Sequence, residues 1–295
     1  ELWLQKDMSQ RQWEFIWESL KSLKIDLAEN NLHLNILFGD TSEIFKKLYQ
    51  KYSFTKVISE QETGIHWTFE RDKKLKSLFK ELNVHWIEYP YFGVKRGSHN
   101  RDYWAGSIQQ ILKKPLIKKE KYIDQSVILM SEQIQTPSNF YDQTPCPFRQ
   151  KGGSHKAHDL LDTFLEGRGE NYQKEMSSPI TAENSCSRLS PHFAHGTLSL
   201  RQAYQLAEKK RFEVQSTNKV FAKSINAFIS RLYWRSHFIQ KLEDEPSIEL
   251  QSFIPLYDDI REQDEKKLQS WIKGETGIPF IDACMIYLRN HGWIN

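Results

Sequence analysis

The first 90 residues alternate between stretches with a helical spacing of apolar side chains and short apolar runs. A spacing of three or four residues predicts an amphipathic helix, and a short run of apolar or β-branched residues predicts a strand. Alternation of the two with short connections predicts a parallel α/β sheet. The helical stripes are Trp13/Ile16/Trp17/Leu20, Ile44/Phe45/Leu48/Tyr49 and Leu75/Leu78/Phe79/Leu82, and the predicted strands are 34–38, 55–59 and 84–89.

Capping residues mark the borders of the second and third helices. Asp40 lies at the N-cap position, and Glu43 occupies the capping-box position three residues later. Asn83 follows the last apolar residue of the third helix and is expected to end it. The third strand follows directly, so this helix and strand are joined by a short turn.

Residues 111–154 have the composition of a connecting segment. A basic run is followed by a polar stretch with several prolines and the pair Gly152-Gly153, and such a composition rarely packs as a core. A basic run of this kind is more often a solvated surface than a binding site. Its lysines are Lys113, Lys114, Lys118, Lys119 and Lys121. We therefore predict an α/β domain over 1–110, a linker over 111–154 and a second domain over 155–295.

The second domain has helical periodicity almost throughout. Helical spacing of apolar residues predicts that these helices pack into a common core. No internal repeat is evident. The stripes are Leu160/Leu161/Phe164/Leu165, Ala203/Tyr204/Leu206/Ala207, a long apolar helix over 221–242, and Ile281/Met285/Tyr287/Leu288.

Residues 185–202 contain two helix starts in close succession. Ser190 before Pro191 is typical of an N-cap with proline at the first helical position, and Gly196 is expected to end that short helix. Ser199 and Gln202 predict a capping box for the next helix. Free backbone N–H groups and the hydroxyls of Ser187 and Ser190 would then cluster around Arg188, which suits a phosphate or diphosphate. The alternative is two well-capped structural helices.

Composition limits the remaining possibilities. The 295 residues are enough for two domains, and no apolar run approaches the length of a membrane span. Three widely separated cysteines make a disulfide framework improbable and favour a reducing, cytoplasmic location. The chain has 41 Lys+Arg and 38 Asp+Glu, and residues 151–295 hold 19 of each group. This half of the chain is therefore neutral overall, and its net charge gives no support for nucleic-acid binding.

Three ordered motifs carry a resemblance to a known family. The phrase Ser187-Arg188-Leu189-Ser190-Pro191, continued by Ala194-x-Gly196-Thr197-Leu198-Ser199, resembles the flavin-phosphate segment of the DNA photolyase/cryptochrome family. Two later stretches, 226–235 and 277–295, agree in order and spacing. The resemblance implies an N-terminal α/β domain of photolyase type, a long linker, and an all-α domain that binds FAD folded into a U.

The family's cofactor residues carry over to named positions. The resemblance implies that Tyr172 packs beside FAD and that the segment Cys186, Ser187, Arg188, Leu189 and Ser190 holds its phosphates. Family members often have threonine at Cys186, and a thiol is the weaker donor. Phe228 and Arg235 would lie near the flavin, where a fixed cation favours the reduced, anionic form. Trp293 would lie at the rim of the pocket.

The implied reaction is light-driven electron transfer from reduced FAD to a pyrimidine dimer flipped out of DNA. Trp234 would be the wall on which the dimer stacks, with Phe238 one helical turn further on. Lys174 would contact the DNA where Met176 replaces an arginine of the family. Arg231 replaces a glutamate that hydrogen-bonds the thymines, and Arg261 replaces a tryptophan of the electron-transfer chain. These departures leave a signalling cryptochrome without repair activity as the alternative function.

Both ends of the sequence differ from the family pattern. The first strand of the α/β domain is missing at the start, and the residues that follow Gly292-Trp293 in the family, which contact the flavin ring, are missing at the end. We therefore expect a fragment that binds FAD weakly or not at all by itself and is inactive alone. A second, antenna chromophore of unknown identity is possible in this family. We expect a monomer without membrane contact.

Two further alternatives follow from the residues. The pairs His155/His158 and His192/His195, with Cys186 near in sequence, have a spacing that can share a metal, but no pattern supplies a third ligand. We therefore predict no metal site. A helical interaction module without enzymatic activity is the other alternative for the sequence taken by itself.

Overall fold

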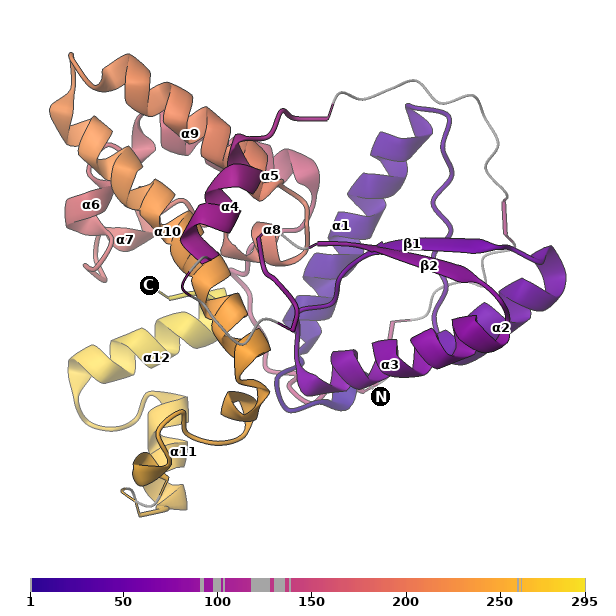
Figure 1. The fold of residues 1–295 in the computed structure, drawn as a ribbon. Coiled ribbons are helices and arrows are strands. Elements are labelled where there is room, and N and C mark those ends of the chain that lie inside the picture. Colours follow the sequence, from indigo (N-terminus) through magenta and orange to yellow (C-terminus); the bar gives the residue numbers. More distant parts are fainter. Residues whose placement is uncertain are drawn as a thin grey trace.

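The computed structural model describes residues 2–90, 93–97, 102, 104–117, 128–129, 136–137, 139–258, 260 and 262–294. Two groups of helices meet along the middle of the molecule (Figure 1). One accompanies a small sheet, and the other forms a helical bundle. Lys118, Lys119, Lys121 and Arg261, which the sequence singled out, lie outside the described residues.

A two-stranded parallel sheet confirms the last two predicted strands. Strand β1 (Lys56–Glu60) pairs with β2 (His85–Tyr89) in a register that runs from Lys56 opposite His85 to Glu60 opposite Tyr89. Helix α3 (His66–Glu81) connects them as a crossover, and α2 (Thr41–Tyr52) precedes β1. The predicted parallel α/β arrangement is therefore present in this part of the chain.

The strand predicted over residues 34–38 is wrong. These residues make no ladder hydrogen bonds, and the Leu37 and Phe38 side chains are exposed. A strand exists only where a neighbouring strand completes its hydrogen bonds. In the described part of the chain, β1 and β2 pair only with each other, so an apolar run at 34–38 has no partner.

Local signals around the sheet are confirmed. The Asp40 carboxylate accepts a hydrogen bond from the Glu43 amide at 3.0 Å and caps α2. Asn83 adopts a positive φ of 55° and turns the chain between α3 and β2. The α3 stripe is buried, whereas the α2 stripe is only half-buried. The small core beneath the sheet consists of Leu75, Leu78, Phe79 and Val84, with Phe45, Tyr49, Phe54, Val57, Leu82 and Trp86 against it.

Helix α1 (Gln10–Ala28) lies between the sheet and the helical bundle (Figure 1). The prediction of a single buried face is incomplete, because Trp13 and Phe15 are both buried. They are two positions apart in the sequence, which places them about 200° apart around the helix. The Phe15 ring contacts the rings of His192 and His195, at 5.1 and 5.4 Å between centroids. A helix held between two layers buries both sides.

The helical bundle is built around α10 (Lys219–Asp244), the longest helix described. Its buried residues belong to one large core that also draws on α5, α6, α8 and α9. The other elements are α4 (Trp104–Lys113), α5 (Ser154–Thr163), a π-helical turn η2 (Phe164–Arg168), α6 (Tyr172–Glu175), α7 (Ala182–Ser185), α8 (Ser190–Ala194), α9 (Leu200–Val214), α11 (Glu265–Lys273) and α12 (Pro279–His291), with short 3-10 turns η1 (Leu2–Leu4), η3 (Pro246–Glu249) and η4 (Pro255–Tyr257).

Helix α4 crosses the predicted boundary at residue 110. Ile108 and Leu112 on this helix are both 0% exposed and belong to the core of the bundle, where α4 packs on α9 and α10. Gln205 of α9 donates to the carbonyls of Leu112 and Lys114 at 2.9 and 2.7 Å. Leu112, the second residue of the predicted linker, is therefore part of the core of the bundle. The division into domains otherwise stays a prediction.

The last two helices pack mainly on each other. Neither α11 nor α12 has a fully buried residue. Among the described helices, none combines the length and apolar character required to cross a membrane.

Candidate functional site

The connection between α7 and α8 is a tight turn held by two buried side chains. Cys186 and Leu189 are both buried in the core of the bundle. Between them, Arg188 has a φ of +61°, and Leu189 follows with φ −90° and ψ −4°. A left-handed residue followed by a right-handed one makes successive backbone N–H groups point to the same side. The turn therefore forms a concave row of donors.

Those donors are available. Within the described part of the chain, the backbone N–H groups of residues 187–190 donate to no protein acceptor. Ser190 differs from the prediction: it is the first residue of α8 rather than its N-cap, and its side chain is exposed. Among the described residues, neither the Ser187 nor the Ser190 hydroxyl makes a hydrogen bond. The predicted cluster of hydroxyls around Arg188 stays a prediction.

The Arg188 side chain turns inward. It is 10% exposed, its guanidinium lies 3.6 Å from the Glu183 carboxylate, and the Trp293 ring covers it at 4.2 Å from its centroid. Its Nε is buried and has no hydrogen-bond partner in the structure. Trp293, which was predicted at the rim of the pocket, forms a cation–π pair with Arg188. An orphaned guanidinium N–H beside free amides is a fit for an anion with several oxygen acceptors.

A second guanidinium lies beneath the same turn. Arg168 donates to the carbonyls of Leu160, Asn184 and Cys186. Burial and, secondarily, the positive charge of Arg188 lower the pKa of Arg168. Burial raises the pKa of the Cys186 thiol to about 11, so this cysteine stays neutral. The turn therefore carries two cations against the single carboxylate of Glu183.

Tyr172 and Phe228 lie in the core. The Phe164 ring lies 5.6 Å from the Tyr172 ring and 4.9 Å from the Phe228 ring. Burial raises the pKa of Tyr172. Arg235 points elsewhere and donates to the Phe193 carbonyl at 3.1 Å. The structure thus brings residues 186–190 together with Trp293, and it places Tyr172, Phe228 and Arg235 around them rather than in contact with Arg188.

The residues expected at DNA form an exposed surface across α6 and α10. The Arg231 guanidinium lies 4.8 Å above the Trp234 ring and 4.0 Å from the Met176 sulfur. Lys174 is exposed on α6. Trp234 and Phe238, both about half-exposed, lie on the same side of α10 with ring centroids 5.9 Å apart. The prediction that these two rings share a face is confirmed.

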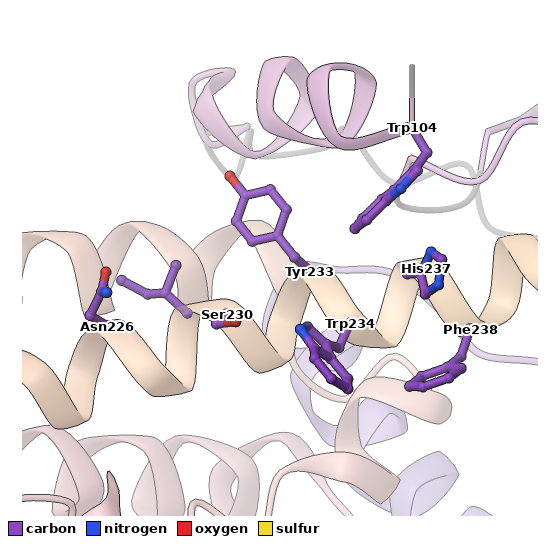
Figure 2. A pocket seen from close by; sticks show the side chains of 8 residues that line it. Trp104, Asn226, Ser230, Tyr233, Trp234, His237 and Phe238 are labelled. Carbon is purple, nitrogen blue, oxygen red and sulfur yellow. The ribbon is translucent and has the colours of Figure 1, made fainter. Parts of the chain in front are cut away.

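A cavity of about 560 Å³ adjoins this surface. Figure 2 shows Tyr233, His237 and Trp104 on one side of α10 and Trp234 and Phe238 on the other. Trp104 comes from α4 and contacts His237 at 4.9 Å between ring centroids. Trp104 was not singled out from the sequence, because no helix was predicted over residues 104–113, at the end of the predicted α/β domain.

A second cavity of about 530 Å³ lies between the sheet and α10. The turn after β1 lines one wall through Glu60 and Glu62, and Arg235 and Ile239 line the other. The carboxyl ends of parallel strands are a common ligand position. Among the described residues, no cluster of His, Cys, Asp and Glu is arranged to hold a metal ion.

Several residues at the turn were not found from the sequence. Arg168 lies in a Gly-Arg-Gly phrase without a functional pattern, and Glu183 resembles any surface carboxylate. Tyr287 was assigned to an apolar stripe, yet its ring stacks on His291 at 3.8 Å, and His291 lies 3.9 Å from Glu183. Only the fold brings α12 onto the turn.

Comparison with known proteins decides the family. The model described as "DNA photolyase" matches residues 2–90, and the model described as "FAD binding domain of DNA photolyase" matches residues 228–295. The chain belongs to the photolyase/cryptochrome family. Of the three motifs found in the sequence, 277–295 and most of 226–235 lie within the second match. The segment 187–199 lies outside both matches, and its assignment to the flavin phosphates stays a prediction.

Individual members are distant. A deoxyribodipyrimidine photo-lyase of Halobacterium salinarum is 32% identical over 144 residues, which are 48% of this chain and 29% of that protein. Cryptochrome-2 of Gallus gallus is 23% identical over 312 residues, covering 96% and 52%. The photolyase fold is shared with a class III photolyase from Agrobacterium tumefaciens, with a TM-score of 0.75 and 20% identity. It is also shared with an archaeal photolyase from Sulfolobus tokodaii, solved with two FAD molecules, with a TM-score of 0.68 and 24% identity. Each comparison covers 97% of this chain and 61% of the other. The chain thus spans between about a third and three fifths of these relatives.

Proposed function

We propose that the turn over residues 186–190 binds the diphosphate of FAD. The proposal is carried by the buried, unpartnered Nε of Arg188, on a turn whose backbone N–H groups at residues 187–190 have no acceptor among the described residues. A diphosphate supplies the oxygen acceptors that these donors lack, and charge-assisted hydrogen bonds are the strong ones. Cys186 and Leu189 would act through their backbone, because their side chains are in the core.

The remaining cofactor residues would act at a distance from the phosphates. Tyr172 and Phe228 support the aromatic core under the site. Trp293 would shield one face of Arg188, which strengthens electrostatics by excluding water. FAD, when bound, would supply the light-driven electron transfer of the family. Arg235 would place a fixed cation near the flavin.

We propose light-driven repair of pyrimidine dimers in DNA as the function of the protein. Two features support this function. The Trp234 and Phe238 rings are exposed, and a flipped base can stack on them. The cations Lys174 and Arg231 are suited to contact phosphate groups. A cryptochrome-type photoreceptor without repair is the second candidate. The observation that favours it is Arg231, whose guanidinium cannot accept hydrogen bonds from a base.

A second chromophore would suit the cavity between the sheet and α10. The size of this cavity, its apolar lining residues and the nearby Arg71 fit a large aromatic ligand with polar groups. The solved relative with two FAD molecules supports a second chromophore by analogy alone. The identity of such a chromophore stays open.

The proposal is tested by measuring FAD and inorganic pyrophosphate binding to the 295-residue chain. We expect weaker FAD binding than in a full-length photolyase, since the chain spans only part of its relatives. Arg188→Ala should weaken FAD and pyrophosphate binding by roughly 10- to 100-fold, because about 1.5–3 kcal/mol of charged hydrogen bonding is lost. Arg188→Lys should recover part of it.

The function itself is tested by adding dimer-containing DNA and light to the flavin-loaded protein. Repair that Trp234→Ala reduces, at unchanged flavin absorbance, supports the photolyase assignment. Light-induced flavin changes without repair support the cryptochrome. Equal pyrophosphate affinity in wild type and Arg188→Ala contradicts the diphosphate site.

A further inference from the structure

We propose that Arg168 is a positioning residue that holds the amides of the phosphate turn in their anion-binding orientation. The inference rests on the proposed diphosphate site and adds a residue to it. The described partners of the Arg168 guanidinium are protein groups, namely three carbonyls and the Thr163 hydroxyl. Its effect on a ligand is therefore indirect.

The three carbonyls that Arg168 binds lie near the C-terminal ends of two helices. Leu160 lies near the C-terminus of α5, while Asn184 and Cys186 lie at the C-terminus of α7. Carbonyls in the last turn of a helix carry partial negative charge, so a guanidinium there is favourable. One side chain thus ties two helix ends together. The distances are 2.8 Å to Leu160 and 3.3 Å to Asn184, with Cys186 the third acceptor.

The bond to Cys186 fixes the first amide of the turn. In a trans peptide the carbonyl and the following N–H point in opposite directions, and the described chain contains no cis peptide. Because Arg168 draws the Cys186 carbonyl toward itself, the Ser187 N–H points away from it. That is the first of the free amides. Arg188 then follows at φ +61° and continues the row.

Arg168 also adds charge. Its guanidinium is close enough to Arg188 for the second cation to lower its pKa, after the larger effect of burial. Arg188 has Glu183 as a carboxylate partner, whereas the described contacts of Arg168 are with neutral oxygens and the Phe164 ring. The excess positive charge under the turn favours a ligand with at least two negative charges, as a diphosphate has.

The experiment compares Arg168→Met and Arg168→Lys with a matched surface pair, Arg211→Met and Arg211→Lys. Arg211 bonds Glu208 within α9 and is remote from the turn in sequence. Binding of pyrophosphate and of FAD is measured on the intact chain, together with the amide ¹⁵N–¹H signals of Ser187 and Arg188 without ligand. Circular dichroism shows which variants are folded at the working temperature.

We expect Arg168→Met to weaken pyrophosphate binding at least 10-fold and to move the Ser187 amide signal, with a smaller change for Arg168→Lys and none for the Arg211 variants. Unchanged pyrophosphate binding in folded Arg168→Met, beside a wild type that binds, overturns the positioning role alone. A wild type that does not bind pyrophosphate overturns the diphosphate site and the positioning role together. If Arg168→Met does not fold, a fully wild-type affinity and Ser187 signal in Arg168→Lys contradict the inference.

Discussion

At the scale of single residues, Arg188 combines a strained backbone with a buried charge. A left-handed conformation of a residue other than glycine costs on the order of 1 kcal/mol or more, and it persists where surrounding contacts enforce it. Here the buried neighbours Cys186 and Leu189 enforce it. Such strain is typical of functional sites, and in this turn it is what aligns the free amides.

Glu183 competes with an anion for Arg188. Its carboxylate lies 3.6 Å from the guanidinium and is 45% exposed, so the pair is screened and contributes little stability. A bound diphosphate would meet the same carboxylate as a like charge. We expect Glu183→Gln to strengthen pyrophosphate binding by roughly 2- to 5-fold, the equivalent of a surface ion pair of up to about 1 kcal/mol. Calorimetric titration measures it, with Glu213→Gln on α9 as control; weaker binding in Glu183→Gln would contradict the competition.

The sequence allowed the site to be located but not assembled. Arg188 and its neighbours stood out because their motif is contiguous, and the motif carried the family. Glu183, Arg168 and Tyr287 reach the turn from other elements, and their contacts depend on how α7, η2 and α12 pack. Ser190 was misjudged as an N-cap because serine before proline fits that position, whereas the helix begins one residue earlier.

At the scale of elements, periodicity predicted most helices, and the failures have one cause. Helices α1, α3, α9 and α10 carry long apolar stripes that identify them without tertiary information. The run over 34–38 and helix α4 are short, and a short apolar segment becomes strand, helix or loop according to what it packs against. For α4 the deciding partners are α9 and α10.

Substitution of Leu112 tests how much α4 contributes to the stability of the bundle. Leu112 is 0% exposed and belongs to the main core, so Leu112→Ala leaves a cavity as well as losing buried apolar surface. We expect the free energy of unfolding to fall by about 2–5 kcal/mol, measured by urea denaturation. Lys113→Ala, at the exposed neighbouring position, should change it by less than about 0.5 kcal/mol. Equal effects of the two substitutions would show that α4 is not part of the core.

At the scale of the whole molecule, the two layers meet where Phe15 of α1 contacts His192 and His195. His192 belongs to α8, and the first residue of α8, Ser190, is also the last residue of the turn over 186–190. The contact with Phe15 therefore links α1 to that turn. Neither histidine was assigned this role from the sequence, which offered them only as a possible metal pair. The structure makes them packing residues between layers.

Burial of His192 makes that junction sensitive to acid. Its Nδ1 lies 2.8 Å from Thr197 Oγ1, its Nε2 is buried without a partner, and burial, with a smaller effect of His195, lowers the pKa of His192 to about 4. The unfolded chain takes up the proton near pH 6.5 and the folded chain only near pH 4, so stability is lost as pH falls through this interval. The pKa of His195 is also lowered, by desolvation against α1, and acts in the same direction, although this residue is partly exposed.

We expect the free energy of unfolding to decrease by on the order of 2 kcal/mol between pH 7 and 5 through His192 alone. This window lies above the range in which the carboxylates Glu18 and Asp142, whose pKa values are lowered, lose their charge. Urea denaturation across the window measures the slope. His192→Gln, which cannot titrate, should flatten it, whereas the exposed His85→Gln should leave it unchanged. The same slope in His192→Gln and wild type would mean that the proton is taken up elsewhere and that the α1–α8 contact does not respond to pH.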